Sequence, residues 1–193
     1  MTDQASFARF IDAVRPGLSA MVIVGGWAHR LHRLHAAARP LPHPPLMTRD
    51  TDVAVGDALR RSGVDLGSRL RDAGFAVDLT GDDVPPVTRY RQGGQESGFY
   101  VEFVTPLRGS GVTRNRRPDV TTSIAGVTAQ KLRYVELHMI DPWVIPLDAL
   151  SGFPLSAPAA VQVTFPRSSP VRRECRLAAS RLRPGGFFLV ADP

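Results

Sequence analysis

Apolar residues recur along the chain with two periods, one typical of helices and one typical of strands. Phe7, Phe10, Ile11 and Val14 recur every three or four residues, which predicts an amphipathic helix over residues 4–18. The same spacing predicts shorter helices over residues 27–34, 68–74 and 127–138. Short apolar or alternating runs predict strands over residues 21–24, 51–55, 75–79, 87–91, 98–107 and 141–147.

The order of these elements indicates an α/β or α+β domain, with a mixed β-sheet and helices packed against it. A doubly wound dinucleotide-binding fold fits less well, because no GxGxxG follows the first strand and the middle of the chain is hairpin-like. We place the domain at residues 1–155. Residues 156–193 are rich in arginine, contain only Glu174 and Asp192 as acids and lack a long amphipathic pattern, so we treat them as a C-terminal tail whose structure the sequence does not define.

The composition is that of a globular chain with excess positive charge. With 193 residues, 43% of them hydrophobic and 22% charged, one domain with a substantial core is expected. The chain has no apolar run of membrane-spanning length, no signal-peptide pattern and a single cysteine, Cys175, so we expect a cytoplasmic protein without a membrane partner. The net charge of +6 favours an anionic partner, either nucleotide or nucleic acid. Since Lys131 is the only lysine, the arginine excess equally fits a GC-rich coding sequence.

A pair of glycines, Gly25 and Gly26, stands where the first apolar run gives way to helical spacing from Trp27. This order predicts a strand, a tight turn and a helix. Glycine lets backbone amides approach an anion closely, and a helix that begins just behind the turn adds the positive end of its dipole. The turn is therefore a candidate phosphate-binding site.

Three acidic residues are candidates for a metal site. Asp50 and Asp52 are two residues apart at the start of a predicted strand, so their carboxylates project from one face of it. Glu102 lies in an otherwise apolar strand, and the predicted hairpin over residues 87–107 would bring it beside the two aspartates. Hard oxygen ligands of this kind suit Mg²⁺, which is usually held by one or two carboxylates plus substrate phosphates.

A glycine pair at a strand–helix turn, followed by Asp50-x-Asp52 on the next strand, resembles the signature of the nucleotidyltransferase superfamily, which shares its fold with DNA polymerase beta. The sequence GGWA, followed by TRDTDVAV, is most similar to that of the small bacterial branch of AbiEii-like toxins. The resemblance covers about residues 20–147. It implies that a third carboxylate on a later strand completes the metal site, and Glu102 is the position that fits.

The resemblance also implies an activity, the transfer of a nucleoside monophosphate from a nucleoside triphosphate such as ATP to an acceptor hydroxyl. Asp50 and Asp52 would hold one Mg²⁺ ion and, together with Glu102, a second one. Gly25, Gly26, Trp27 and Arg49 are expected to contact the nucleotide. The acceptor is an RNA or tRNA end, a protein or a small molecule, and the AbiEii likeness implies a toxin role with an antitoxin protein as partner.

Other interpretations of the same residues remain open at this stage. The chain is alternatively a non-catalytic module that binds nucleotide or RNA, and Glu102 is alternatively the partner of a basic residue such as Arg89 in a salt bridge. His29, His32 and His35 recur every three residues and either hold zinc in a structural protein or line the mouth of the nucleotide site.

Overall fold

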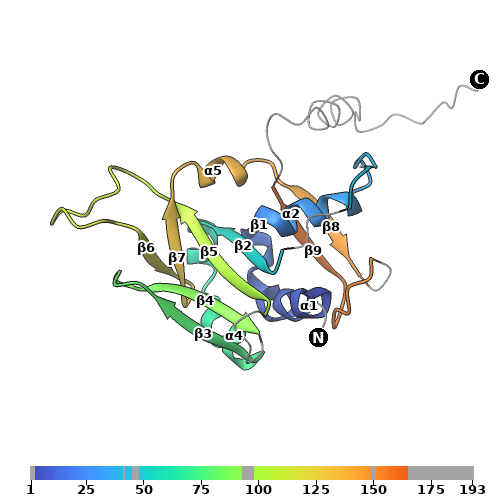
Figure 1. Ribbon diagram of the computed structural model, residues 1–193, viewed down its shortest axis with the longest axis horizontal. Coiled ribbons are helices and arrows are strands. Elements are labelled where there is room, and N and C mark those ends of the chain that lie inside the picture. Colours follow the sequence, from blue (N-terminus) through green and yellow to red (C-terminus); the bar gives the residue numbers. More distant parts are fainter. Residues whose placement is uncertain (1–2, 41, 45–47, 93–97, 149–150, 165–193) are drawn as a thin grey trace, which may run out of the picture.

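The structure is a computed structural model that describes residues 3–40, 42–44, 48–92, 98–148 and 151–164. Its helices are short, and most lie in the first half of the chain (Figure 1). The α-helices are α1 (Asp3–Val14), α2 (Gly25–Leu31), α3 (Asp57–Arg61), α4 (Leu66–Asp72) and α5 (Val135–His138), with 3-10 turns at Arg15–Ala20 and His32–Leu34. Among these helices, none combines the length and the apolar character needed to cross a bilayer.

Nine strands form one mixed sheet in the described part of the chain. They are β1 (Met21–Val24), β2 (Asp50–Val55), β3 (Phe75–Thr80), β4 (Val87–Gln92), β5 (Tyr100–Pro106), β6 (Thr121–Ile124), β7 (Val127–Leu132), β8 (Trp143–Leu147) and β9 (Ala159–Val163). The main order is β3-β4-β5-β2-β1-β9-β8, with β6 and β7 branching from β5. The predicted mixed sheet with helices against it is confirmed, and the strand predicted over residues 141–147 lies at an edge of the sheet as β8.

The strand β5 is the branch point of the sheet because its two halves have different neighbours. Its first half pairs antiparallel with β4, and its second half pairs parallel with β7. Along its other side β5 runs parallel to β2, which in turn pairs antiparallel with β1. The chain thus places β2 and β5 side by side at the centre, far from either edge.

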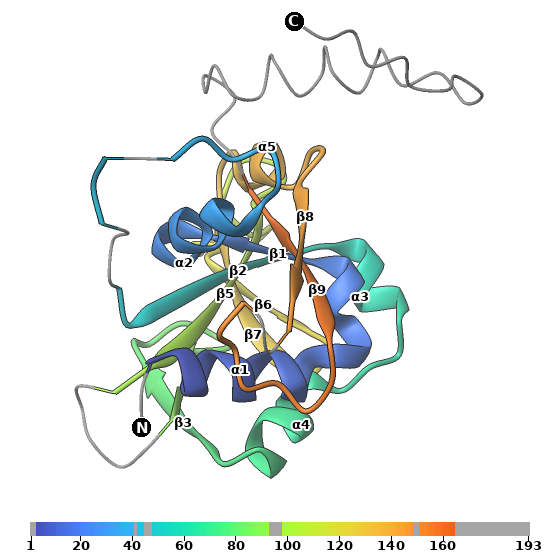
Figure 2. The ribbon, with the colours of Figure 1, turned by 90° about the vertical axis from the view of Figure 1, so that its right-hand side faces the viewer.

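The two faces of the sheet are packed differently. The large core lies on the face covered by α1, α2 and α4, where Phe7 and Trp27 pack among Val53, Val101 and other buried residues. The opposite face carries a small apolar cluster that α5 covers at one end of the central strands. Both views place α5 on the side of the sheet away from α1 and α4 (Figures 1 and 2). Most of the burial that stabilises the fold is therefore on one face.

The helix predicted over residues 127–138 is wrong. Residues 127–132 form β7, and only Val135–His138 are helical. Val127 and Ala129 are buried while Thr128 and Gln130 are half-buried, which is the two-residue period of a strand. Two residues with positive φ, Ala125 (51°) and Gly126 (77°), join β6 to β7 in a tight hairpin, and this turn fixes the strand that the helical interpretation missed.

The sheet extends beyond the domain boundary predicted at residue 155. Strand β9 pairs parallel with β1 through Ile23 and Val163, and antiparallel with all of β8. Val161 and Val163 are fully buried because they complete the core beside β1. Residues 156–164 therefore belong to the domain, and the rest of the predicted tail, residues 165–193, lies outside the described residues.

Candidate active site

Two aspartates of β2 and one glutamate of β5 lie on the same face of the sheet. Alternation along β2 sends Thr51 into the core and leaves Asp50 and Asp52 half-buried on the opposite face. Strand β5 runs parallel beside β2, with Glu102 directly opposite Asp52 and Tyr100 opposite Asp50. The hairpin expected from the sequence thus brings the three acids together, on the face away from the main core.

The electrostatics of this cluster centre on Asp52. Burial, followed by the like charges of Asp50 and Glu102, raises the pKa of Asp52 from 3.8 to about 6. A raised carboxyl pKa means that the folded chain disfavours the charged form at this position. A bound cation would reverse that preference by compensating the three negative charges.

The third acid has a basic partner in the structure. Arg89 on β4 lies opposite Glu102 in the antiparallel register, and its Nε donates to Glu102 Oε1 at 2.7 Å. The guanidinium also lies 5.2 Å from the centre of the Tyr100 ring. Hydrogen bonding to Glu102 raises the pKa of Arg89. The salt bridge expected as an alternative role for Glu102 is therefore formed, and it offsets part of the negative charge beside Asp52.

The glycine pair lies directly against the acid-bearing strand. Gly25 has a left-handed φ of 68°, and a Cβ atom added to it would lie 2.7 Å from Asp52 Oδ2. A Cβ atom on Gly26 would overlap the side chain of Thr48, two residues before Asp50. Both positions need glycine because a larger residue would push the turn away from β2. The backbone of the turn therefore sits beside the carboxylates.

A family model described as Nucleotidyltransferase matches residues 4–169, which is most of the chain. The chain belongs to this nucleotidyltransferase family. No curated protein and no solved structure matches it. The superfamily expected from the glycine pair and the aspartates is thereby confirmed, and the match covers the acids, the glycine turn and β9.

Trp27, one of the nucleotide contacts predicted for this nucleotidyltransferase, has its side chain in the core. It is 1% exposed and stacks on Phe7, with ring centroids 4.1 Å apart and planes 6° apart. Helical spacing in α2 turns this position toward α1. Arg49 is exposed at the start of β2, and its carbonyl accepts a hydrogen bond from the Tyr100 N–H at 3.2 Å.

The donor chemistry of the acid cluster fits Mg²⁺, although the side chains do not converge on one point. Among the described residues, no three His, Cys, Asp or Glu side chains are arranged so that they could hold a metal ion together. Mg²⁺ needs fewer protein ligands than that, because substrate phosphates and waters complete its octahedral shell. Asp50 and Asp52 on one strand face meet this requirement, and Glu102 shares one carboxylate oxygen, Oε1, with Arg89.

The histidines do not form a zinc site in the described part of the chain. The His29 and His32 rings lie 5.4 Å apart, and His32 Nδ1 hydrogen-bonds the His29 carbonyl oxygen at 2.6 Å. His35 instead stacks on Trp143 of β8, with ring centroids 3.9 Å apart. Burial lowers the pKa of both His29 and His35, so both favour the neutral form. These contacts tie the end of α2 to the sheet edge.

Proposed function

We propose that this nucleotidyltransferase is Mg²⁺-dependent, and that Asp50, Asp52 and Glu102 bind the metal and the reacting phosphates. One observation carries the proposal, namely that Asp52 and Glu102 face each other on adjacent parallel strands with Asp50 on the same face. The raised pKa of Asp52 supports it, because an uncompensated cluster of carboxylates is the state that a divalent cation relieves.

The reaction would join an acceptor oxygen to the α-phosphorus of a nucleoside triphosphate and break the bond to the pyrophosphate oxygen. Asp50 and Asp52 would hold two Mg²⁺ ions together with Glu102, and the ions when bound neutralise phosphate charge and favour the deprotonated acceptor hydroxyl. The backbone at Gly25 and Gly26 would lie against the phosphates, since the turn touches Asp52. Asp52, with a pKa of about 6, is mainly ionised at neutral pH and ready to bind cations.

For the acceptor we propose an RNA or tRNA end, with a protein or a small molecule as the other acceptors to test. The support is the net charge of +6 and the arginine-rich composition, which favour a polyanion. The likeness of GGWA and TRDTDVAV to AbiEii-like toxins supports a toxin role with an antitoxin protein as partner.

The experiment is label transfer by the full chain, with Mg²⁺, each α-labelled nucleoside triphosphate in turn, and either total RNA or cell lysate as acceptor. We expect the wild type to transfer label, and the labelled species identifies the acceptor. Asp52→Asn and Glu102→Gln should lose transfer while staying folded. Asp82→Asn is the matched control, because Asp82 is exposed in the loop after β3 and should retain full activity.

Two results would count against this function. If Asp52→Asn transfers label as well as the wild type does, the metal site is not on β2. If the wild type binds nucleoside triphosphate saturably in the presence of Mg²⁺ but transfers nothing to any acceptor, the chain is instead a nucleotide-binding module.

A further inference from the structure

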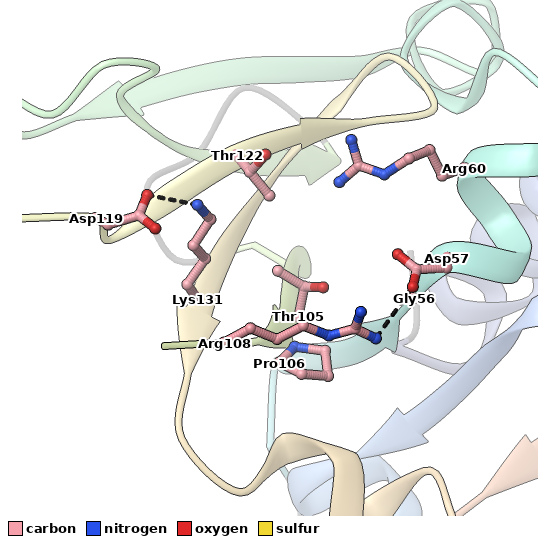
Figure 3. A pocket seen from close by; sticks show the side chains of 9 residues that line it. All are labelled: Gly56, Asp57, Arg60, Thr105, Pro106, Arg108, Asp119, Thr122 and Lys131. Carbon is pink, nitrogen blue, oxygen red and sulfur yellow. Dashed lines mark hydrogen bonds and ion pairs between the residues drawn. The ribbon is translucent and has the colours of Figure 1, made fainter. Parts of the chain in front are cut away.

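A cavity of about 290 Å³ lies at the opposite end of the central strands from the acid cluster. It opens at Gly56, just after β2, and at Thr105 and Pro106, where β5 ends, and its other walls include residues of α3, β6 and β7 (Figure 3). Gly56 is four residues beyond Asp52 along an extended chain, a separation of roughly 13 Å. The cavity is therefore distinct from the acid cluster on the same strands.

The charges around this cavity leave one cation without an acidic partner. Arg108 pairs with Asp57, with Nη2 3.0 Å from Oδ2, and Lys131 pairs with Asp119. Within each of these two pairs, the acid and the base neutralise each other's charge. The guanidinium of Arg60 on α3 makes no ion pair or hydrogen bond with any residue in the described ranges. Figure 3 shows it extending from α3 toward β6, across the cavity.

Two threonine hydroxyls line the same space. Thr105 is only 6% exposed, and its hydroxyl points into the cavity without a hydrogen bond to any residue that the structure describes. Thr122 on β6 lies opposite the Arg60 guanidinium. The Thr105 hydroxyl is open to the cavity, where it can donate a hydrogen bond to water or to a bound group.

We propose that this cavity is a second anion site, in which Arg60, Thr105 and Thr122 bind a phosphate group. A guanidinium offers a planar fork of donors that matches phosphate oxygens, and hydroxyls donate to the same oxygens. Arg108 and Lys131 add positive potential at the rim while their paired acids limit it, so binding depends on Arg60. The phosphate belongs either to a small phosphorylated molecule or to a polynucleotide backbone.

The test is equilibrium dialysis of labelled inorganic phosphate against the full chain at low ionic strength. Arg60→Ala should weaken phosphate binding at least about tenfold, because a hydrogen bond to a charged group contributes about 1.5–3 kcal/mol. Arg61→Ala is the matched control, since Arg61 is the next residue of α3, is exposed and does not line the cavity. Thr105→Val keeps the side-chain shape, removes the hydroxyl and should also weaken binding.

A short single-stranded RNA without terminal phosphates separates the two sources of the phosphate group. If the RNA competes with inorganic phosphate, and if Arg60→Ala weakens its binding, the site binds a polynucleotide backbone. If it does not compete, the site serves a small phosphorylated molecule. The dialysis contains neither Mg²⁺ nor a nucleoside triphosphate, so its result does not depend on whether the proposed reaction occurs. Equal phosphate affinity in Arg60→Ala and Arg61→Ala, or no saturable binding by the wild type, would overturn the proposal.

Discussion

We expect Asp52→Asn to stabilise the metal-free fold at neutral pH, although it removes a carboxylate of the proposed active site. Burial and the charges of Asp50 and Glu102 raise the pKa of Asp52 from 3.8 to about 6. At about 1.36 kcal/mol per pKa unit, this shift corresponds to about 3 kcal/mol of cost for an ionised Asp52 in the folded state. Since the side chain is only partly buried, solvent screening reduces the expected gain to about 1–2 kcal/mol.

The pH dependence of this gain has a definite sign. Below pH 3.8 Asp52 is protonated in both the folded and the unfolded chain, so its ionisation costs no stability. As the pH rises toward 6, the unfolded chain releases its proton more readily, and the folded state loses stability until the cost levels off. Asparagine resembles the protonated acid at every pH. The advantage of Asp52→Asn should therefore grow between about pH 4 and pH 6 and stay constant above that range.

The assay is urea unfolding of the wild type and Asp52→Asn across this pH range, with a chelator present to keep the chain metal-free. Asp82→Asn serves as the control, because Asp82 is exposed and its replacement should leave the free energy of unfolding unchanged at every pH. A variant that is less stable than the wild type at neutral pH would refute the reasoning. A gain that does not change with pH would refute it as well, since only titration of Asp52 produces the predicted slope.

Three further substitutions test other parts of the site by urea unfolding. Trp27→Ala should cost about 3–5 kcal/mol, because the side chain is 1% exposed in the core. Gly26→Ala should cost about 1–3 kcal/mol by forcing the turn against Thr48, and adding Thr48→Gly should restore part of the loss. Arg89→Ala should change stability by less than about 1 kcal/mol, because its pair with Glu102 is partly exposed, yet it should tighten Mg²⁺ binding measured by calorimetry.

Each of these expectations has an outcome that contradicts it. A fully stable Trp27→Ala would mean that the ring is not in the core. If Thr48→Gly gives Gly26→Ala no recovery, the two residues do not collide as the geometry indicates. Weaker Mg²⁺ binding in Arg89→Ala would show that Arg89 orients Glu102 for the metal and does not compete with it.

The acid cluster could be predicted from the sequence because it depends on local rules. Alternation along one strand puts Asp50 and Asp52 on one face, and a short hairpin carries Glu102 back to that region. The parallel register that sets Glu102 against Asp52 depends on the whole sheet, which no local pattern specifies. The core position of Trp27 was not predicted, because its place beside the glycine pair suggested a ligand contact, whereas its helical spacing turns the side chain into the core.

Structural features formed by segments far apart in the sequence were not predicted. Strand β9 is a short run next to an arginine-rich segment, and it becomes a strand by pairing with β1, some 140 residues earlier along the chain. The hairpin of β6 and β7 was hidden because its turn is Ala125-Gly126, without the Asn-Gly or Asp-Gly pair that marks such turns most clearly. Arg60 and Thr105 have no sequence pattern in common, so their shared cavity emerges only when α3 packs beside β5.

The fold tolerates clustered carboxylates because the main core and the acid cluster lie on opposite faces of the sheet. The main core lies on the face of α1 and α4, so most of the apolar burial that stabilises the fold is on the face opposite the Asp52 carboxylate. On the other face, Val22, Ala54 and Val104 form a small cluster with Val135 of α5, and the three acids on this face remain half-buried. If burial on the second face extended over Asp52, the cost of its charge would rise further, and the carboxylate would become less accessible to cations and phosphates. The limited apolar cover on this face therefore suits a site whose charges must remain within reach of a substrate.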